Sequence, residues 1–210
     1  MSISLHEQAQ ALQQGRTSSL ELTEAAIARA ADPSGEGARV YTRRYTERAL
    51  AEARASDLMR GAGLTRSVID GLPISIKDLF DVAGEATPAG SVALRDAAPA
   101  AAHSVVVQRL LAAGAVLTGR TNMTEFAYSG LGLNPHHGTP LNPWDRATGR
   151  IPGGSSSGAA VSVSDGMAAA ASEQSPSVAA SVRAWRQRRH ALVPACALSV
   201  GHLDLLALPS

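Results

Sequence analysis

The order of apolar and polar residues between positions 71 and 117 constrains the fold more than any other feature of this sequence. In "GLPISIKDLF", Ile74 and Ile76 alternate with Ser75 and Lys77, which is the period of a β-strand with two different faces. The later segment "SVVVQRLLAAG" has helical spacing and ends at Gly114, before a second short apolar strand. A strand, a helix and a strand in this order predict a right-handed crossover and a largely parallel sheet, which is an α/β fold.

Three helices are predicted before this unit, over residues 4–14, 20–32 and 43–60. The first two begin with a serine that is followed three residues later by glutamate, which is the spacing of a capping box. The third is expected to bury a stripe formed by Ala51, Ala55 and Leu58. None of the three carries a residue pattern that indicates chemistry, so we expect them to be scaffold.

The composition narrows the class of protein. Of 210 residues 45% are hydrophobic, which is enough for a buried core, and 19 basic and 18 acidic side chains give a net charge of +1. This balance gives no electrostatic reason to expect direct binding of nucleic acid. The one cysteine, Cys196, cannot form an internal disulfide, and the sequence has neither a signal peptide nor an apolar run long enough to span a bilayer. We therefore predict a cytoplasmic protein without a membrane partner.

A single lysine and a run of serines form the candidate catalytic site. Lys77 is the only lysine among the 19 basic residues. Ser155 is the first of three serines that follow Gly153 and Gly154 directly. A lysine in apolar surroundings can act as the base that activates a serine, and glycines allow backbone amides to approach a substrate and its developing oxyanion. The alternative interpretation is a surface lysine and a flexible turn.

Four linked segments extend the catalytic interpretation. In chain order they are "GLPISIKDLFDVAG", "GRTNMTEFAYSGLGLNP", "GTPLNPWD" and "GGSSSGAA". Over residues 71–171 they closely resemble the amidase signature family, which includes bacterial amidases, fatty-acid amide hydrolase and the A subunit of the glutamyl-tRNA amidotransferase. The resemblance implies a mixed sheet flanked by helices. It also implies hydrolysis of a carboxylic amide through an acyl-enzyme, without a metal or an organic cofactor.

The resemblance assigns roles to two residues. Lys77 matches the family's catalytic lysine, which is the ultimate proton acceptor and donor. Ser155 matches the serine that follows a cis peptide bond and relays protons between the lysine and the nucleophile. Together they imply a Ser-Ser-Lys mechanism in which the second serine attacks the amide.

The family's nucleophile segment, of the form Asp-Thr/Ser-Gly-Gly-Ser, is absent from the sequence. Counted without gaps from Ser155, the nucleophile position falls at Ala179. A shift of two residues makes Ser181 an alternative candidate, although two alanines precede it where the family has two glycines. We therefore divide the chain into residues 1–171, the N-terminal portion of a C-terminally truncated amidase domain, and residues 172–210, a divergent tail. A change of reading frame is our hypothesis for the origin of the tail.

Other polar residues near these segments have less direct interpretations. Ser75 and Asp78 flank Lys77, and either orient it by hydrogen bonds or are solvated at the strand end. The segment after the second predicted strand contributes residues expected to support the site structurally: Asn122, Thr124 and Glu125.

Two further clusters are not expected to bind ligands. The adjacent His136 and His137 lack a third ligand at suitable spacing, so we predict no metal site. The basic cluster Arg183–Arg189 is expected to be solvated rather than to bind RNA.

Three functional hypotheses remain open. The chain is an amidase by descent, catalytically incomplete for want of a nucleophile, with a small-molecule amide as substrate. Alternatively it resembles the amidotransferase A subunit, which hydrolyses glutamine for tRNA-dependent amidation, or it is a non-catalytic remnant. Uncovered apolar faces and sheet edges would make such a chain poorly soluble, or dependent on a homodimer or a partner subunit.

Overall fold

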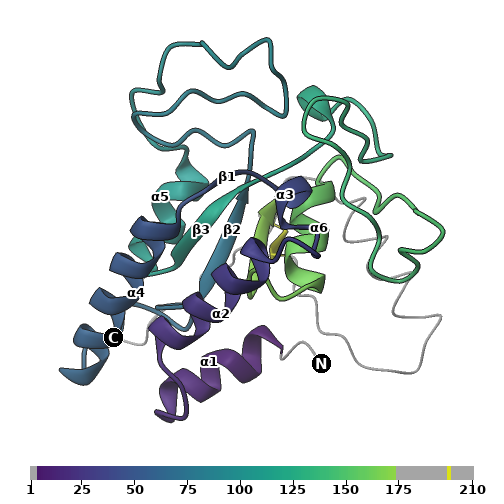
Figure 1. Ribbon diagram of the computed structural model, residues 1–210. Coiled ribbons are helices and arrows are strands. Elements are labelled where there is room, and N and C mark those ends of the chain that lie inside the picture. The colour runs from purple at the N-terminus through teal and green to yellow at the C-terminus, as the bar shows by residue number, and fades with distance from the viewer. Residues whose placement is uncertain (1–3, 174–197, 200–210) are drawn as a thin grey trace.

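The computed structural model of the protein describes residues 4–173 and 198–199, and it shows one sheet with helices around it (Figure 1). The strands are β1 (Tyr41–Arg44), β2 (Pro73–Lys77), β3 (Val116–Thr121), β4 (Ala170–Glu173) and β5 (Leu198–Ser199). The helices are α1 (Leu5–Gln13), α2 (Ser19–Ala31), α3 (Gly37–Val40), α4 (Thr46–Gly61), α5 (Val105–Ala112) and α6 (Ser157–Ser164). A short 3-10 helix, η1, follows β3 at Glu125–Ala127.

The sheet is mixed, as the family resemblance implies. Its strand order is β1-β3-β2-β4-β5. β1 pairs antiparallel with β3, whereas β2 pairs parallel with both β3 and β4, and β4 pairs parallel with β5. The predicted strand, helix and strand are β2, α5 and β3, so the α/β class is confirmed.

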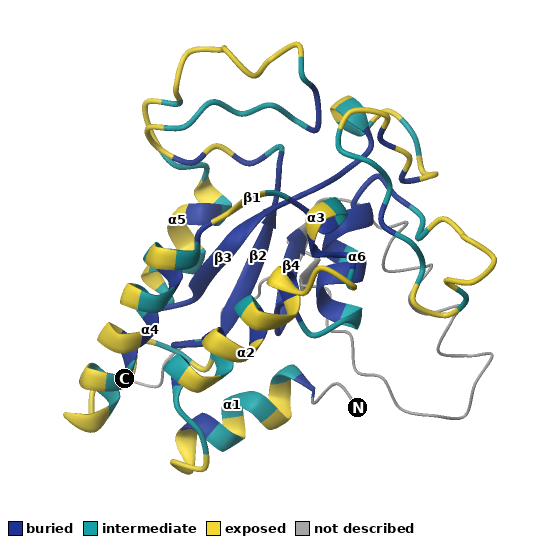
Figure 2. Ribbon diagram, viewed as in Figure 1, coloured by how far each residue is buried: buried dark blue, intermediate teal, exposed yellow. Residues whose placement is uncertain are grey.

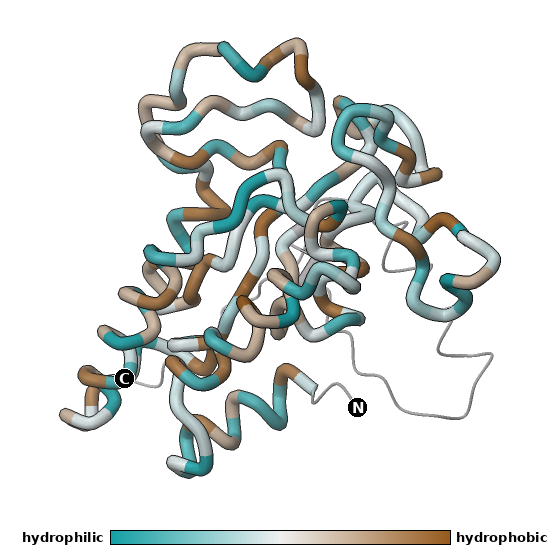
Figure 3. The backbone as a smooth tube through the Cα atoms, viewed as in Figure 1, coloured by the Kyte–Doolittle hydropathy of each residue, from teal (hydrophilic) through white to brown (hydrophobic). Residues whose placement is uncertain are grey.

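The core lies on both faces of β2, all five residues of which are buried. Figure 2 shows the central strands buried and the outer sides of the helices exposed. On one face Ile76 packs with Val107 of α5 and with Phe80, which follows β2. On the other face lies α6, where Ala159 packs against Ala171 of β4. Figure 3 shows the corresponding pattern of hydropathy, with hydrophobic residues along the central strands and hydrophilic residues interspersed along the helices.

The third predicted helix begins later than expected. Arg43 and Arg44 belong to β1, and α4 begins at Thr46. The strand was not predicted because "YTRR" has no apolar alternation. It is held instead by antiparallel pairing with β3 and by packing of Tyr41, which is buried.

The predicted stripe of α4 is wrong. The helix buries Ala49, Ala53 and Ser56 instead, and Leu58 is 77% exposed. Alanines occur on both sides of this helix, so hydrophobicity alone could not select the inner face. Ser56 is accommodated because its hydroxyl donates to the buried Asp70 carboxylate at 3.0 Å.

The predicted boundary after residue 171 falls inside β4, since Ser172 is paired with Ile76 of β2. The division of the chain into an amidase portion and a divergent tail stays a prediction. In the part of the chain that the structure describes, no helix has the length and apolar character needed to cross a membrane.

Candidate active site

Lys77 and Ser155 meet at the carboxyl end of β2. Lys77 is the last residue of that strand, and Ser155 lies two residues before α6. The Lys77 Nζ donates to Ser155 Oγ at 2.7 Å, and the two residues are 1% and 7% exposed. The Gly154–Ser155 peptide bond is cis, as the resemblance implies. The interpretation of Lys77 as a surface lysine is therefore wrong.

Strand geometry explains why Lys77 points toward the serines. Side chains two residues apart in a strand share a face, so Ser75 and Lys77 project together. Ser75 Oγ lies 3.0 Å from Ser162 Oγ of α6, which places this face of β2 against α6. Because α6 begins just after Ser155, the same packing brings Ser155 to the lysine.

The backbone of Ser155 is held by two loops. Its carbonyl accepts from Thr124 N–H at 2.8 Å, which is the structural support expected of that residue. Gly154 N–H donates to Gly130 O at 2.8 Å. A Cβ on Gly132 would lie 2.2 Å from Gly153 O, so the two loops approach each other at distances that only glycine allows.

These contacts bear on the expectation that the glycines support an oxyanion. The Gly154 amide is already bonded to a carbonyl, so this geometry gives it a structural role. Oxyanion support by the Gly153 amide stays a prediction. Gly153 has φ +83°, a conformation that favours glycine.

Several hydroxyls next to Ser155 are buried. Ser156 and Ser157 are fully buried, and Thr124 is 2% exposed. Within residues 4–173 and 198–199, none of their hydroxyl oxygens has a hydrogen-bond partner. Burying a hydroxyl without a partner is unfavourable, so this end of α6 retains unused hydrogen-bonding capacity beside the candidate relay.

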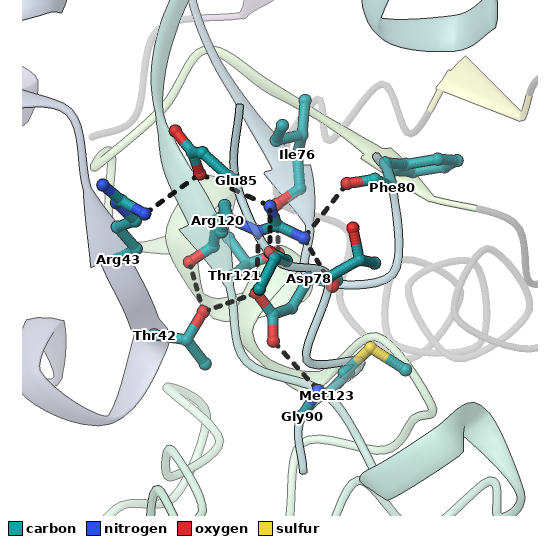
Figure 4. Close-up of polar contacts among 12 residues, drawn as sticks. Thr42, Arg43, Ile76, Asp78, Phe80, Glu85, Gly90, Arg120, Thr121 and Met123 are labelled. Atoms are coloured by element: carbon teal, nitrogen blue, oxygen red, sulfur yellow. Dashed lines mark hydrogen bonds and ion pairs between the residues drawn. The ribbon is translucent and has the colours of Figure 1, made fainter. Parts of the chain in front are cut away.

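Asp78 is buried rather than solvated, and so is Ser75, so solvation at the strand end is wrong for both. The Asp78 carboxylate accepts from Arg120 Nε at 2.9 Å, Thr42 Oγ1 at 3.0 Å and Gly90 N–H at 2.9 Å (Figure 4). Asp78 therefore belongs to an ionic network around Arg120.

The network around Arg120 was not found from the sequence. Arg120 lies in β3 and is 1% exposed. Its guanidinium also reaches Glu85, which accepts from the Tyr45 hydroxyl at 2.7 Å. Burial and then this bond to Glu85 raise the pKa of Tyr45 well above its usual value. The available signal was an arginine shortly after the apolar residues Val116 and Leu117 that begin β3.

The remaining predicted residues lie in the loops around the site. Asn122 donates to the carbonyls of Arg39 and Gly138, which is a structural role. Glu125 Oε1 lies 3.1 Å from His136 Nε2. Among the described residues no group of three histidine, cysteine, aspartate or glutamate side chains could hold a metal ion. Ala179, Ser181 and Arg183–Arg189 lie outside the described residues.

Comparisons with known proteins agree with the resemblance that the sequence motifs indicate. The family model described as Amidase matches residues 21–183. AtzE, a 1-carboxybiuret hydrolase component of Pseudomonas sp. (strain ADP), is 46% identical over 72% of this chain and 33% of its own length. The A subunit of the glutamyl-tRNA(Gln) amidotransferase of Chloroflexus aggregans is 43% identical over 74% of this chain and 31% of its own length.

Solved structures agree. A structure described as a vestigial protein complex that reveals the origins of an s-triazine catabolic enzyme is 43% identical with a TM-score of 0.73, and covers 79% of this chain and 36% of its own. Peptide amidase from Stenotrophomonas maltophilia is 34% identical with a TM-score of 0.67, and covers 79% of this chain and 34% of its own. The chain spans about a third of the length of the curated relatives that it matches. The matches in sequence and fold show that this chain belongs to the amidase signature family.

Proposed function

We propose that this chain carries the base and the proton relay of an amidase site, and that its 210 residues do not complete the site. The observation that carries the proposal is the buried hydrogen bond of 2.7 Å between Lys77 Nζ and Ser155 Oγ. A buried lysine bonded to a serine is suited to accept a proton through that serine. The absence of Asp-Thr/Ser-Gly-Gly-Ser from the sequence supports the second part.

The proposed chemistry is hydrolysis of a carboxylic amide in two steps. A nucleophilic serine transfers its proton to Ser155 as Ser155 transfers its own to neutral Lys77, and the serine oxygen attacks the carbonyl carbon. The carbon–nitrogen bond then breaks, and the departing amine takes a proton back along the same path. Water hydrolyses the resulting acyl-enzyme with the relay acting as base again.

A chimera tests whether the relay is competent. Residues 172–210 are replaced by the corresponding and following residues of AtzE, and hydrolysis of small carboxylic amides is measured. We expect activity in the chimera and a loss of roughly 100- to 10,000-fold on Lys77→Met, which is the range for loss of a general base. An active chimera that is indifferent to Lys77→Met and to Ser155→Ala would contradict the proposal.

A second candidate function is glutamine hydrolysis in an amidotransferase. Relatives that are A subunits of glutamyl-tRNA(Gln) amidotransferases, from several organisms, are 40–43% identical to this chain. Preference of the chimera for glutamine over other amides would favour this function. Preference for glutamine would also favour a partner subunit over a homodimer. Light scattering of the purified chain gives its molar mass and so shows whether the chain forms a homodimer on its own.

The origin of residues 172–210 has a separate test. If a change of reading frame produced them, another frame of the downstream coding DNA encodes Asp-Thr/Ser-Gly-Gly-Ser. A downstream sequence with no such frame would remove this hypothesis and leave a non-catalytic remnant as the simpler account. The predicted cytoplasmic location also remains a proposal.

A further inference from the structure

Arg120 lies directly behind the candidate relay. It is opposite Ile76 in the parallel pairing of β3 with β2. Paired residues of neighbouring strands project to the same face, and successive residues of one strand project to opposite faces. Arg120 is therefore on the reverse face of the sheet from Lys77.

All five N–H groups of the Arg120 guanidinium have an acceptor. Figure 4 shows Arg120 among its partners Asp78, Phe80 and Glu85. Nε donates to Asp78 Oδ1 at 2.9 Å. Nη1 donates to Glu85 Oε2 at 3.4 Å and to Ala86 O at 3.2 Å. Nη2 donates to Asp78 O at 2.9 Å and to Phe80 O at 3.1 Å. Every acceptor belongs to residues 78–86, so one side chain gathers the segment that follows β2.

This segment begins immediately after Lys77. Asp78, its first residue, is bonded to Arg120 through both its carbonyl and its carboxylate. Asp78 N–H donates to Thr121 O at 3.1 Å, which ties the peptide unit between Lys77 and Asp78 to the end of β3. The backbone on the carboxyl side of Lys77 is thus fixed from behind at several atoms.

The charges of the network also matter to the lysine. Arg120 is buried and pairs with the carboxylates of Asp78 and Glu85, and Arg43 also pairs with Glu85, so two cations balance two carboxylates. The negative charge next to Lys77 in the chain is therefore committed to the reverse face. A lysine at position 120 would keep the charge but offer three donors in place of a planar set of five.

We propose that Arg120 is a positioning residue, which fixes the end of β2 so that Lys77 Nζ stays within hydrogen-bond distance of Ser155 Oγ. The inference rests on the proposed function, because it assigns a purpose to the position of Lys77. Arg120 lies on the opposite face of the sheet from Lys77 and Ser155, so it is not a catalytic residue.

The single lysine provides a direct readout. Wild-type protein labelled with carbon-13 lysine gives one Cε side-chain signal, from Lys77. An arginine-to-lysine variant gives a second signal, which is identified by adding Lys77→Met to that variant, because only the introduced lysine then remains. Ser155→Ala serves as the reference, since it removes the hydrogen-bond partner and is expected to move this signal. In Arg120→Lys we expect the signal to move away from its wild-type position, and addition of Ser155→Ala to that variant to move it little further.

A matched control separates positioning from general destabilisation. Arg66→Lys disturbs another ion pair of a largely buried carboxylate, between Arg66 and Asp70, away from the relay. It should lower the melting temperature and leave the Lys77 signal in place. Should Arg120→Lys not fold, Glu85→Gln removes a single acceptor and is expected to move the signal less in the same direction.

The outcomes distinguish the two proposals. A Lys77 signal that ignores Ser155→Ala overturns the relay itself. A signal that moves with Ser155→Ala but stays in place in folded Arg120→Lys, or in Glu85→Gln where Arg120→Lys does not fold, overturns only the role of Arg120. Equal movement in Arg66→Lys also overturns it, because the effect would then follow from stability alone.

Discussion

The two faces of β2 differ in how completely their polar groups are bonded. On the reverse face every N–H of Arg120 has an acceptor. On the α6 side Lys77 is bonded to Ser155, but the hydroxyls of Ser156 and Ser157 have no partner within the described residues. On the reverse face the hydrogen bonds of the buried arginine are therefore complete, whereas on the α6 side two buried hydroxyls beside the relay remain available for hydrogen bonds. We infer that the Arg120 face supports the structure of the site, whereas the α6 side carries the groups that would perform the chemistry.

The largest effect is expected on the reverse face. Arg120→Met leaves the buried Asp78 carboxylate without its cation, and loss of one partner of a buried pair costs about 3–5 kcal/mol. Urea unfolding followed by circular dichroism measures the change. A loss below about 1 kcal/mol, as for an exposed ion pair, would show that the network does not stabilise the fold.

Gly132→Ala tests the close approach of the two loops that hold Ser155. Gly132 has φ +80°, and a Cβ there would meet the Gly153 carbonyl. Gly84→Ala is the matched control, because Gly84 has φ +81° and nothing within 4 Å of its Cβ position. The control should cost only about 1–2 kcal/mol for the left-handed conformation. Gly132→Ala should cost clearly more, and equal losses would contradict the packing described.

The serines at the start of α6 offer a finer contrast. Ser155→Ala leaves a buried lysine without its hydroxyl partner, and should cost about 1–3 kcal/mol. Ser156→Ala and Ser157→Ala remove buried hydroxyls that lack partners here, so their unfolding free energies should stay within about 1 kcal/mol of wild type or rise. Thermal unfolding of the three variants compares them. A larger loss at Ser156 or Ser157 than at Ser155 would reverse the assignment.

The smallest effect concerns Asp70, which precedes the amino-terminal end of β2, whereas Lys77 lies at the carboxyl end. Burial raises the pKa of Asp70, but hydrogen bonds from Arg66 and Ser56 together lower the pKa by more than burial raises it. The folded pKa of Asp70 therefore lies below its ordinary value. Such a group stabilises the fold above its unfolded pKa of about 3.9 and ceases to do so as pH falls through the folded value. The stability advantage of wild type over Asp70→Asn should therefore shrink as the pH is lowered from 6 to 3. A constant difference would contradict the shift.

Much of the scaffold follows from sequence patterns. The alternation in "ISIK" placed Lys77 on one face of a strand, and the glycine at position 114 marked the crossover to β3. These signals are local, so neighbouring residues carry them. β1 and the inner face of α4 were not predictable in this way, since pairing with β3 and the buried Ser56–Asp70 bond decide them.

The candidate site divides in the same manner. Lys77 and Ser155 could be named from composition and motif, and the distance between them required only that α6 pack on β2. The Arg120 network could not be named, because its acceptors are mostly carbonyls in an irregular segment. Every residue has a backbone carbonyl, so the residue types alone do not show which carbonyls accept these hydrogen bonds.

The most direct test of the account is an assay of the 210-residue chain itself. The purified protein is incubated with a fluorophosphonate probe and with small carboxylic amides, beside Lys77→Met as control. We predict no labelled serine, at Ser181 or elsewhere, and no turnover above that of the control. Amide hydrolysis that disappears in Lys77→Met would contradict it, because a complete catalytic site would then exist in this chain.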